Sequence, residues 1–219
     1  MGKICKRIDV KAAVCGDSMK IEKVRKLGIE EIKKLYRECM QRDFPANELR
    51  PFSMIKNLVK KGQYAVYGAY NAESLTGYFC VLLSEKSNVI LLDYLAVQYG
   101  MRGCGVGSSL LNSLIGTIKR DYPEAELIAI ECEAPQKTKN LQEMTTRKRR
   151  ISFYQKNGAV LTNYGWYAFG VEYQLLALAV KSVDLNSVDL GMEVYNLYLS
   201  SFNFYFRLLA KKKLRHWKF

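Results

Sequence analysis

Hydrophobic and polar positions along this chain fall into short segments whose spacing changes from one segment to the next. The stretch 89–97 is almost continuously apolar and rich in branched and aromatic residues, a pattern typical of a strand buried on both faces. A glycine-rich turn follows. Beyond it, apolar residues recur at helical spacing and predict an amphipathic helix packed back on the sheet: Leu110, Leu111, Leu114, Ile115 and Ile118.

The remaining periodicities predict a mixed sheet with helices around it. The stripe within 30–40 indicates one helix, and a second is expected over 53–61 with Ser53 as its N-cap. The helix after the turn should join strand 89–97 to a parallel strand by a right-handed crossover. The fold class is therefore α+β. Further strands are expected over 19–26, 64–70, 76–83, 126–132, 164–169 and 171–180.

The turn carries the first chemical signal. Gly100, Gly103, Gly105 and Gly107 allow backbone amides to converge on an anion at the start of the following helix. A P-loop is excluded because serines follow Gly107 where that motif needs a lysine. The dinucleotide-binding fingerprint is a weak match because its third glycine is replaced by Ser108.

The motif that fits is Arg102-x-x-Gly105-x-Gly107 directly after a strand ending Leu95-Ala96-Val97. Together with the segment Ile151-Ser152-Phe153-Tyr154-Gln155-Lys156-Asn157-Gly158-Ala159, it resembles the GNAT superfamily of N-acetyltransferases over about residues 19–179. The resemblance implies a mostly antiparallel sheet whose splayed parallel strands hold acetyl-coenzyme A. Its pyrophosphate and pantetheine arm would lie on Leu95, Ala96, Val97, Arg102, Gly103, Cys104, Gly105, Val106, Gly107 and Ser108.

Basic residues further along are also candidates for the coenzyme. Arg147 stands where family members commonly carry an asparagine, which removes that contact. Arg147 or Arg150 could instead pair with a coenzyme phosphate, since guanidinium binds phosphate in a fork. A solvated basic helix face is an equally good interpretation.

Three domain segments are expected. Residues 1–18 form an N-terminal extension or an extra strand, 19–180 the acetyltransferase domain, and 181–219 a basic, aromatic helical extension. The helix predicted over 190–217 is apolar on several sides, so it should pack under its own sheet, against another copy in a homodimer, or over the acceptor site. Its cationic end suits the helix dipole better than a membrane surface or nucleic acid.

Charge and cysteine content narrow the class of protein. The 219 residues are 49% hydrophobic, and 34 basic against 21 acidic residues give a net charge of +13, which suits a polyanion such as coenzyme A as well as simple solubility. Six cysteines without a CxxC pair, and a single histidine, predict no metal site and a reduced, cytoplasmic protein. No apolar run approaches the roughly 20 residues of a membrane span.

Acetyl transfer requires an amine made neutral, a polarised carbonyl and a protonated leaving thiolate. Backbone N–H groups at 95–97 are placed to polarise the carbonyl. Asp93, a carboxylate inside an apolar strand, is the first candidate base and should share a face with Leu91, Leu95 and Val97. A purely structural aspartate is the slightly favoured alternative. Glu131 and Glu133, on one face of the neighbouring strand, are competing bases.

Two further sets of residues complete the predicted site. The Phe153-Tyr154 pair resembles the helix in which many family members place a tyrosine near the coenzyme sulfur, which implies that Tyr154 is the acid; by pattern alone it is a core residue. Glu48, Arg50 and Phe52 are candidate acceptor contacts, with solvated loop charges and a core aromatic as the alternative.

The sequence therefore predicts direct acetyl transfer from acetyl-coenzyme A to a primary amine of a small molecule, peptide or protein. The alternative is a non-catalytic coenzyme A-binding sensor or adaptor acting through its basic C-terminal helix. A nucleic-acid binder is a third class.

Overall fold

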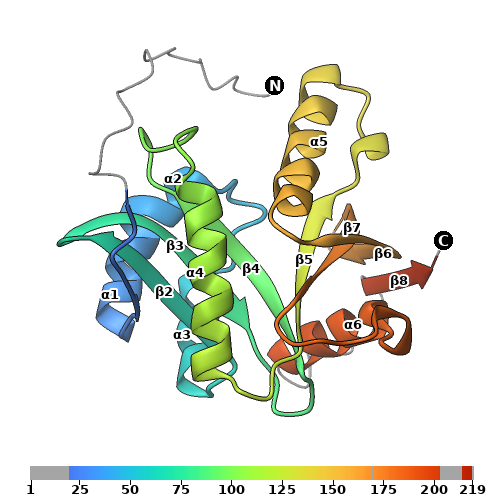
Figure 1. The fold of residues 1–219 in the computed structure, drawn as a ribbon, viewed down its shortest axis with the longest axis horizontal. Coiled ribbons are helices and arrows are strands. Elements are labelled where there is room, and N and C mark those ends of the chain that lie inside the picture. Colours follow the sequence, from blue (N-terminus) through green and yellow to red (C-terminus); the bar gives the residue numbers. More distant parts are fainter. Residues whose placement is uncertain (1–19, 169, 203–213, 219) are drawn as a thin grey trace.

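A computed structural model describes residues 20–168, 170–202 and 214–218 (Figure 1). The elements follow one another as β1 Lys23–Lys26, α1 Ile29–Leu35, a π-helical turn Tyr36–Met40, α2 Gln41–Asp43, α3 Phe52–Lys60, β2 Tyr64–Asn71, β3 Ser74–Leu82, β4 Val89–Val97, α4 Val106–Asp121, β5 Leu127–Glu133, a 3₁₀ turn Pro135–Lys137, α5 Leu141–Lys156, β6 Val160–Ala168, β7 Val171–Ala179, a 3₁₀ turn Leu185–Ser187, α6 Leu190–Ser201 and β8 Leu214–Lys218.

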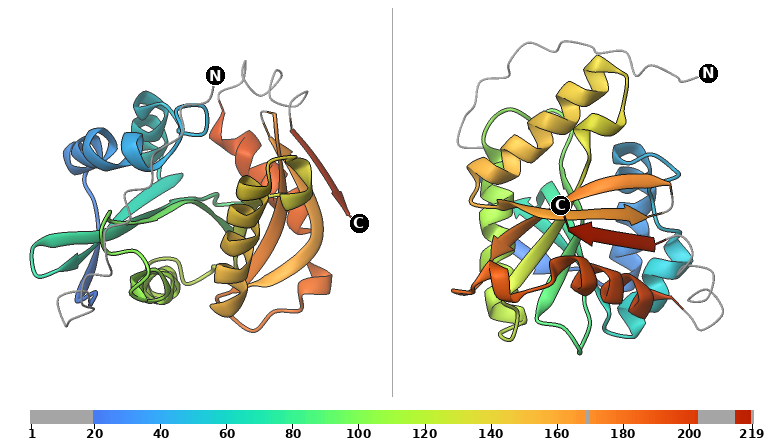
Figure 2. Two further views of the ribbon diagram at one scale, coloured as in Figure 1. Left: turned by 90° about the horizontal axis from the view of Figure 1, so that it is seen from above. Right: turned by 90° about the vertical axis from the view of Figure 1, so that its right-hand side faces the viewer.

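Eight strands form one sheet in the order β1-β2-β3-β4-β5-β7-β6-β8. Every neighbouring pair is antiparallel except β4 and β5, which are parallel, so the predicted α+β class and the crossover are confirmed. Helices α1, α3 and α6 pack on one face, and α4 and α5 pack on the other. Figure 2 shows α1 and α3 on the opposite side of the sheet from α4.

The core consists of two apolar layers separated by the sheet. Along β3, Tyr78 and Cys80 face the layer of α1, α3 and α6, whereas Phe79 and Val81 face the layer of α4 and α5. All four side chains are fully buried. Because alternate residues of a strand point to opposite faces, a sheet covered on both sides needs apolar residues at every position. This explains the nearly continuous apolar run from which β4 was predicted.

The parallel strands separate part of the way along. Pairing between β4 and β5 runs from Val89 opposite Leu127 to Leu92 opposite Ile130 and then stops. Beyond that point β4 remains paired with β3 as far as Val97, and β5 with β7 as far as Glu133 (Figure 1). Each strand therefore has one backbone edge, facing the gap, that no neighbouring strand satisfies.

A β-bulge interrupts β4 at Asp93. Cys80 of β3 pairs with Tyr94 and the next residue, Val81, pairs with Leu92, so Asp93 is an extra residue. Leu91 and Tyr94 therefore lie in one layer and Leu95 in the other. The predicted common face of Asp93 with Leu91, Leu95 and Val97 is wrong for Leu95 and Val97, because the bulge breaks the period of two after Leu92.

Two predicted elements also differ from the structure. Helix α3 starts at Phe52 with Pro51 as its N-cap, two residues before the expected N-cap Ser53. Helix α6 ends at Ser201, and residues 214–218 form an edge strand on β6 rather than helix. The indole of Trp217 lies over Gly165 of β6, so close that a Cβ on Gly165 would collide with it. This packing favours the strand. The predicted extension 1–18 lies outside the described residues.

No helix in the described ranges is long and apolar enough to cross a bilayer.

Candidate active site

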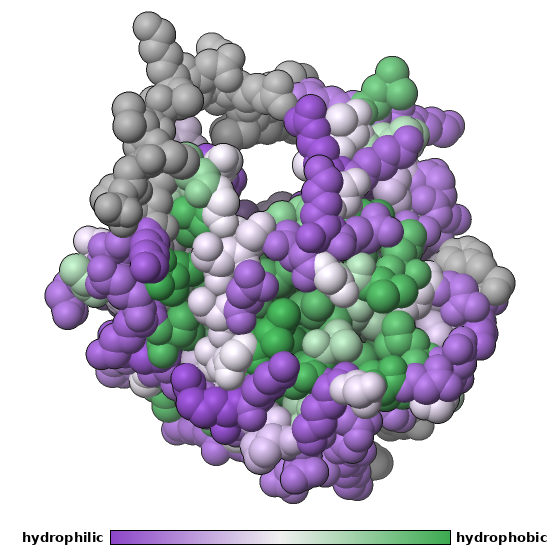
Figure 3. All heavy atoms as spheres, viewed as in Figure 1, coloured by the Kyte–Doolittle hydropathy of each residue, from purple (hydrophilic) through white to green (hydrophobic). Residues whose placement is uncertain are grey.

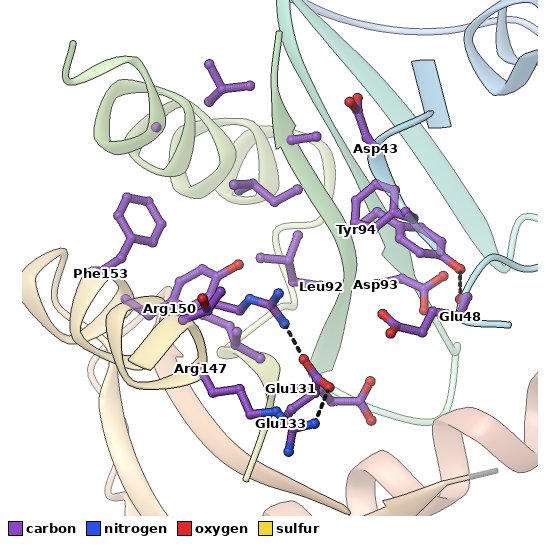
Figure 4. Close-up of a pocket in the computed structure, with 18 of the residues that line it drawn as sticks. Asp43, Glu48, Leu92, Asp93, Tyr94, Glu131, Glu133, Arg147, Arg150 and Phe153 are labelled. Carbon is purple, nitrogen blue, oxygen red and sulfur yellow. Dashed lines mark hydrogen bonds and ion pairs between the residues drawn. The ribbon is translucent and has the colours of Figure 1, made fainter. Parts of the chain in front are cut away.

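A cavity of about 1100 Å³ occupies the fork between β4 and β5. Toward the middle of the face that carries α4, hydrophobic side chains gather, and hydrophilic ones surround them (Figure 3). Figure 4 shows carboxylates and arginines around the cavity itself. Besides the residues discussed below, its walls include Asp43, Phe44, Pro45, Leu92, Ile130, Asn140, Gln142, Thr146 and Phe153.

The glycine loop forms the end of the cavity next to α4. Gly103 (φ +86°) and Gly105 (φ +77°) have left-handed backbones that residues with a Cβ rarely adopt. Gly105 is the N-cap of α4, so the first N–H groups of that helix have no intrahelical partner and the positive end of its dipole points at the loop. A Cβ built on Gly105 would meet no protein atom within 4 Å, which leaves that side of the loop open.

Most of the predicted coenzyme residues line this part of the cavity. They are Leu95, Ala96, Val97, Arg102, Gly103, Gly105, Gly107 and Ser108. Cys104 is not part of the cavity wall, and neither is Val106, the first residue of α4, whose side chain is buried. Nη2 of Arg102 lies 3.7 Å from Oδ1 of Asp43, and the Arg102 side chain is otherwise exposed. The loop thus presents mainly its backbone.

The predicted arginines of α5 reach the cavity but are already paired. Arg147 is buried, and its guanidinium lies 2.9 Å from Oε1 of Glu133, bonds Glu143 and donates to the carbonyl of Ala134 at 2.9 Å. Arg150 Nη1 lies 3.0 Å from Oε2 of Glu133. Figure 4 shows both arginines directed at Glu133. Their charge, and that of Glu133, is therefore largely balanced within the protein.

Asp93 belongs to a buried ion pair. Its carboxylate accepts hydrogen bonds from Arg50 Nε at 2.8 Å, Arg50 Nη2 at 3.3 Å and the hydroxyl of Tyr64 at 2.5 Å. Only 7% of the Asp93 side chain and 10% of the Arg50 side chain are exposed. With a bidentate cation and a phenol as partners, this carboxylate has the environment of a structural group, although it borders the cavity.

Glu131 is in the opposite situation. Its Oε2 accepts a hydrogen bond from Tyr198 at 2.9 Å, and it has no ion-pair partner in the part of the chain that the structure describes. Burial raises the pKa of Glu131 to about 8; the charge of Asp93 adds to this effect, and Tyr198, Arg50 and the indole of Trp166 oppose it. Oε1 of Glu131 and Nε1 of Trp166 are both buried and make no hydrogen bond.

The loop before α3 forms the wall facing these carboxylates. Tyr94 holds it to β4, since its hydroxyl donates to the carbonyl of Glu48 at 2.8 Å and accepts from the amide of Arg50 at 2.9 Å. The Glu48 side chain lines the cavity, and its pKa is raised by burial and by the nearby Glu133. Phe52 does not line the cavity and packs on Tyr36 instead.

Tyr154 lies on the α5 side of the cavity. Ile151 and Tyr154, one helical turn apart, are buried against the sheet, and Tyr154 also borders the cavity. Burial raises the pKa of its phenol, so the hydroxyl stays protonated at neutral pH. Sequence reasoning missed the three tyrosines Tyr94, Tyr173 and Tyr198. Their only signal was membership of apolar stripes, which a core tyrosine shares.

Comparisons with known proteins agree with this geometry. The sequence profile of a family described as acetyltransferase (GNAT) matches residues 29–159, more than half of the chain. Three solved structures show the same fold. An acetyltransferase assigned to the GNAT family from Bacteroides thetaiotaomicron superposes with a TM-score of 0.61 at 19% identity, covering 79% of this chain and 94% of that one.

The second is the ribosomal-protein-S18-alanine N-acetyltransferase from Escherichia coli, with a TM-score of 0.52 at 14% identity over 75% of this chain and 97% of that one. The third is a chimeric spermidine N-acetyltransferase from Vibrio cholerae, with a TM-score of 0.52 at 12% identity over 72% of this chain and 95% of that one. None of the curated protein sequences compared with this chain matches it significantly. At such low identities the structures show a common fold and leave the acceptor open.

Proposed function

The chain belongs to the GNAT acetyltransferase family, and from that premise we propose that it transfers acetyl directly from acetyl-coenzyme A to a primary amine. The forked strands carry this proposal. One backbone edge of β4 beyond Leu92 faces a cavity without a strand partner, and that edge leads into a loop of open glycines at a helix N-terminus. An extended chain of amides that ends in a diphosphate is complementary to the open strand edge and then to the glycine loop that follows it.

Each half of such a substrate has groups to receive it. The N–H groups of the first turn of α4 suit the diphosphate. On the open edge of β4, the N–H groups of Leu95 and Val97 alternate with those bonded to β3, and they suit the pantetheine amides and the thioester carbonyl. Holding both reactants in line is itself worth several kcal/mol, because effective molarities of aligned groups reach about 10⁵ M or more. No covalent enzyme intermediate is needed.

Glu131 is the proposed base in place of Asp93 and Glu133, whose carboxylates are occupied by arginines. An alkyl ammonium group has a pKa of about 10, so passing its proton to an ordinary glutamate is uphill by roughly 6 units, or about 8 kcal/mol. Because burial raises the pKa of Glu131 to about 8, the same transfer costs only about 3 kcal/mol. A base with this proton affinity can deprotonate the amine directly or through water.

Tyr154 is the proposed acid. The phenol is protonated at neutral pH and borders the cavity from α5, whereas Glu131, the proposed base, borders it from β5. An acid and a base on different elements let the amine lose its proton to one while the departing thiolate gains a proton from the other.

The acceptor is proposed to be a cation without a neighbouring carboxylate. Glu48 and Glu131 both line the cavity, and within the described ranges neither forms an ion pair. In a chain of net charge +13, two acidic groups without an ion-pair partner in one cavity favour an ammonium over an amino acid. The amine acceptors in the names of the Escherichia coli and Vibrio cholerae proteins are consistent with this class.

The test is to measure thiol release from acetyl-coenzyme A with a panel of diamines, peptide N-termini, lysine peptides and free amino acids. We expect turnover with cationic amines, and a rate that rises with pH around 8 as Glu131 loses its proton. Glu131→Gln should lower kcat by about 100-fold or more and remove this dependence, since general-base catalysis contributes that much. Coenzyme binding without turnover for any amine would favour the sensor alternative.

Stability provides a second measure of the same carboxyl. The folded-state pKa of about 8 lies above the ordinary value of 4.5, so Glu131 adds stability at low pH that is lost as the pH rises through about 8. Between pH 5 and 9 the Glu131→Gln variant should therefore lose less stability than the wild type in urea unfolding. Equal losses would contradict the environment described for Glu131.

A further inference from the structure

Part of the cavity wall comes from beyond the segment that the family profile matches. The profile ends at residue 159, whereas Tyr198, on α6, lines the cavity. Asp189 is the N-cap of helix α6, and its side chain accepts a hydrogen bond from the first turn; the helix packs on the same sheet face as α1 and α3. The helix is thus an integral part of the layer next to the acceptor side of the cavity.

Tyr198 is held there from three directions. Its hydroxyl donates to Glu131 at 2.9 Å, its ring lies 5.2 Å from the guanidinium carbon of Arg50, and Trp166 packs against it with ring centroids 5.2 Å apart. The side chain is 7% exposed. A ring fixed by a cation and an indole has one orientation available, so its hydroxyl has a fixed direction.

We propose that Tyr198 is a positioning residue which aims the carboxyl group of Glu131 at the acceptor amine, making α6 part of the active site. The proposal rests on the function assigned above, in which Glu131 is the base. Among the described residues the hydroxyl of Tyr198 is the group that hydrogen-bonds Glu131, whereas the indole N–H of Trp166 favours the carboxylate without forming a hydrogen bond to it. The hydroxyl leaves Oε1, the other carboxylate oxygen, without a hydrogen-bond partner.

The electrostatic role follows from the groups around Glu131. Asp93 on β4 disfavours the charged carboxylate, while Arg50 before α3 and Trp166 on β6 favour it. Tyr198 favours it most strongly, and only burial has a larger effect on the pKa of Glu131. Without the hydroxyl of Tyr198, less opposes the effect of burial on the pKa of Glu131, so this carboxyl group keeps its proton to higher pH.

The test compares Tyr198→Phe with Tyr195→Phe. Tyr195 lies on the same helix and contacts the rings of Trp166 and His216, but it does not line the cavity. We expect Tyr198→Phe to shift the pH at which kcat/KM rises to a value about one unit higher, which lowers activity at pH 7 by up to about tenfold. Coenzyme affinity should not change, and Tyr195→Phe should match the wild type.

A ¹³C NMR titration of labelled glutamate carboxyls gives a readout independent of turnover. The Glu131 resonance, assigned by its loss in Glu131→Gln, should titrate at higher pH in Tyr198→Phe and at the wild-type pH in Tyr195→Phe. In the Glu131→Gln background, Tyr198→Phe should have little further effect on kcat, because its action passes through the missing carboxylate.

The outcomes separate this inference from the proposed function. An active wild type, with Tyr198→Phe leaving both the pH profile and the Glu131 titration unchanged, would overturn the role of Tyr198 alone. An equal loss of kcat from Tyr198→Phe with and without Glu131 would also overturn it. A wild-type protein that acetylates no amine would overturn the proposed function and this inference with it.

Discussion

The two ends of the cavity are built in different ways. The proposed coenzyme end is one continuous stretch of backbone from the second half of β4 through the glycine loop into α4. The proposed acceptor end is made of side chains from β4, β5 and the loop before α3 (Figure 4), together with Tyr198 of α6. Backbone chemistry depends on local conformation, whereas side-chain chemistry depends on which distant segments meet. Substitutions in one segment should therefore change the backbone-built end, whereas changing the side-chain-built end requires substitutions in several segments at once.

The acceptor end also contains two carboxyls in contrasting environments. Asp93 has a cation 2.8 Å away, whereas among the described residues Glu131 has a phenol as its hydrogen-bond partner and no ion-pair partner. A carboxyl group at the fork thus forms a buried ion pair in one case and has a raised pKa in the other.

Breaking the buried ion pair should have the largest effect. Arg50→Met leaves the carboxylate of Asp93 buried without its cation, which costs about 3–5 kcal/mol of folding free energy. Asp93→Asn in the same chain should recover part of that loss. The measurement is urea unfolding at pH 7.

The control is Lys137→Met. Its ammonium lies 2.9 Å from Glu172, much the same distance, but 49% of the Lys137 side chain is exposed. Surface pairs of this kind contribute about 1 kcal/mol or less. Similar losses for Arg50→Met and Lys137→Met would mean that Asp93 is not held as described.

Replacing the proposed acid tests the α5 side of the cavity. Tyr154→Phe should reduce kcat by about 100-fold, because the leaving thiolate then has no positioned proton donor. Coenzyme affinity, measured by calorimetry, should stay at the wild-type value, since the ring and its packing remain. Tyr167→Phe on β6, outside the cavity wall, is the matched control. A wild-type rate for Tyr154→Phe would leave it as a core residue.

Adding one methyl group to the glycine loop should have a smaller effect, confined to the coenzyme end. Gly105→Ala places a Cβ at a position open in the protein, where the diphosphate is proposed to lie, and should weaken coenzyme binding by about tenfold. Gly62→Ala is the matched control. Gly62 also has a left-handed backbone (φ +70°) and open space where a Cβ would lie, but it is outside the cavity wall.

Both alanines should destabilise the fold by about 1–2 kcal/mol, the cost of a Cβ in this conformation. Only Gly105→Ala should change the dissociation constant. Equal coenzyme affinities in the two variants would remove the loop from the coenzyme site.

The segment from β4 through the glycine loop to α4 could be predicted from the sequence because its signals are local. The apolar run of β4, the helical spacing of α4 and the glycines between them all lie within 33 neighbouring positions, from Val89 to Asp121. The fold class and the family followed from this stretch together with the Phe153-Tyr154 segment.

The acceptor half could not be predicted in the same way. Arg50 reaches Asp93 across 43 residues and Tyr198 reaches Glu131 across 67, and neither pair leaves a trace in the local pattern. The bulge is a further reason, because an extra residue in β4 cannot be recognised from the sequence until the pairing of β4 with β3 is known. The edge strand β8 was missed because its strand form depends on Gly165 of β6 leaving room for Trp217.

The bulge at Asp93 sets the phase of the last third of β4. Leu92 and Tyr94 already face opposite layers, so the bulge takes Asp93 out of the alternation and keeps Tyr94 to Val97 in phase with β3. A strand that closed the bulge while keeping Asp93 would exchange the two sets of side chains from Tyr94 to Val97. Tyr94 would then leave the loop that it anchors, and apolar side chains beside the glycine loop would turn toward the carboxylates. The bulge therefore lets β4 carry a carboxylate at the fork without turning over the rest of the strand.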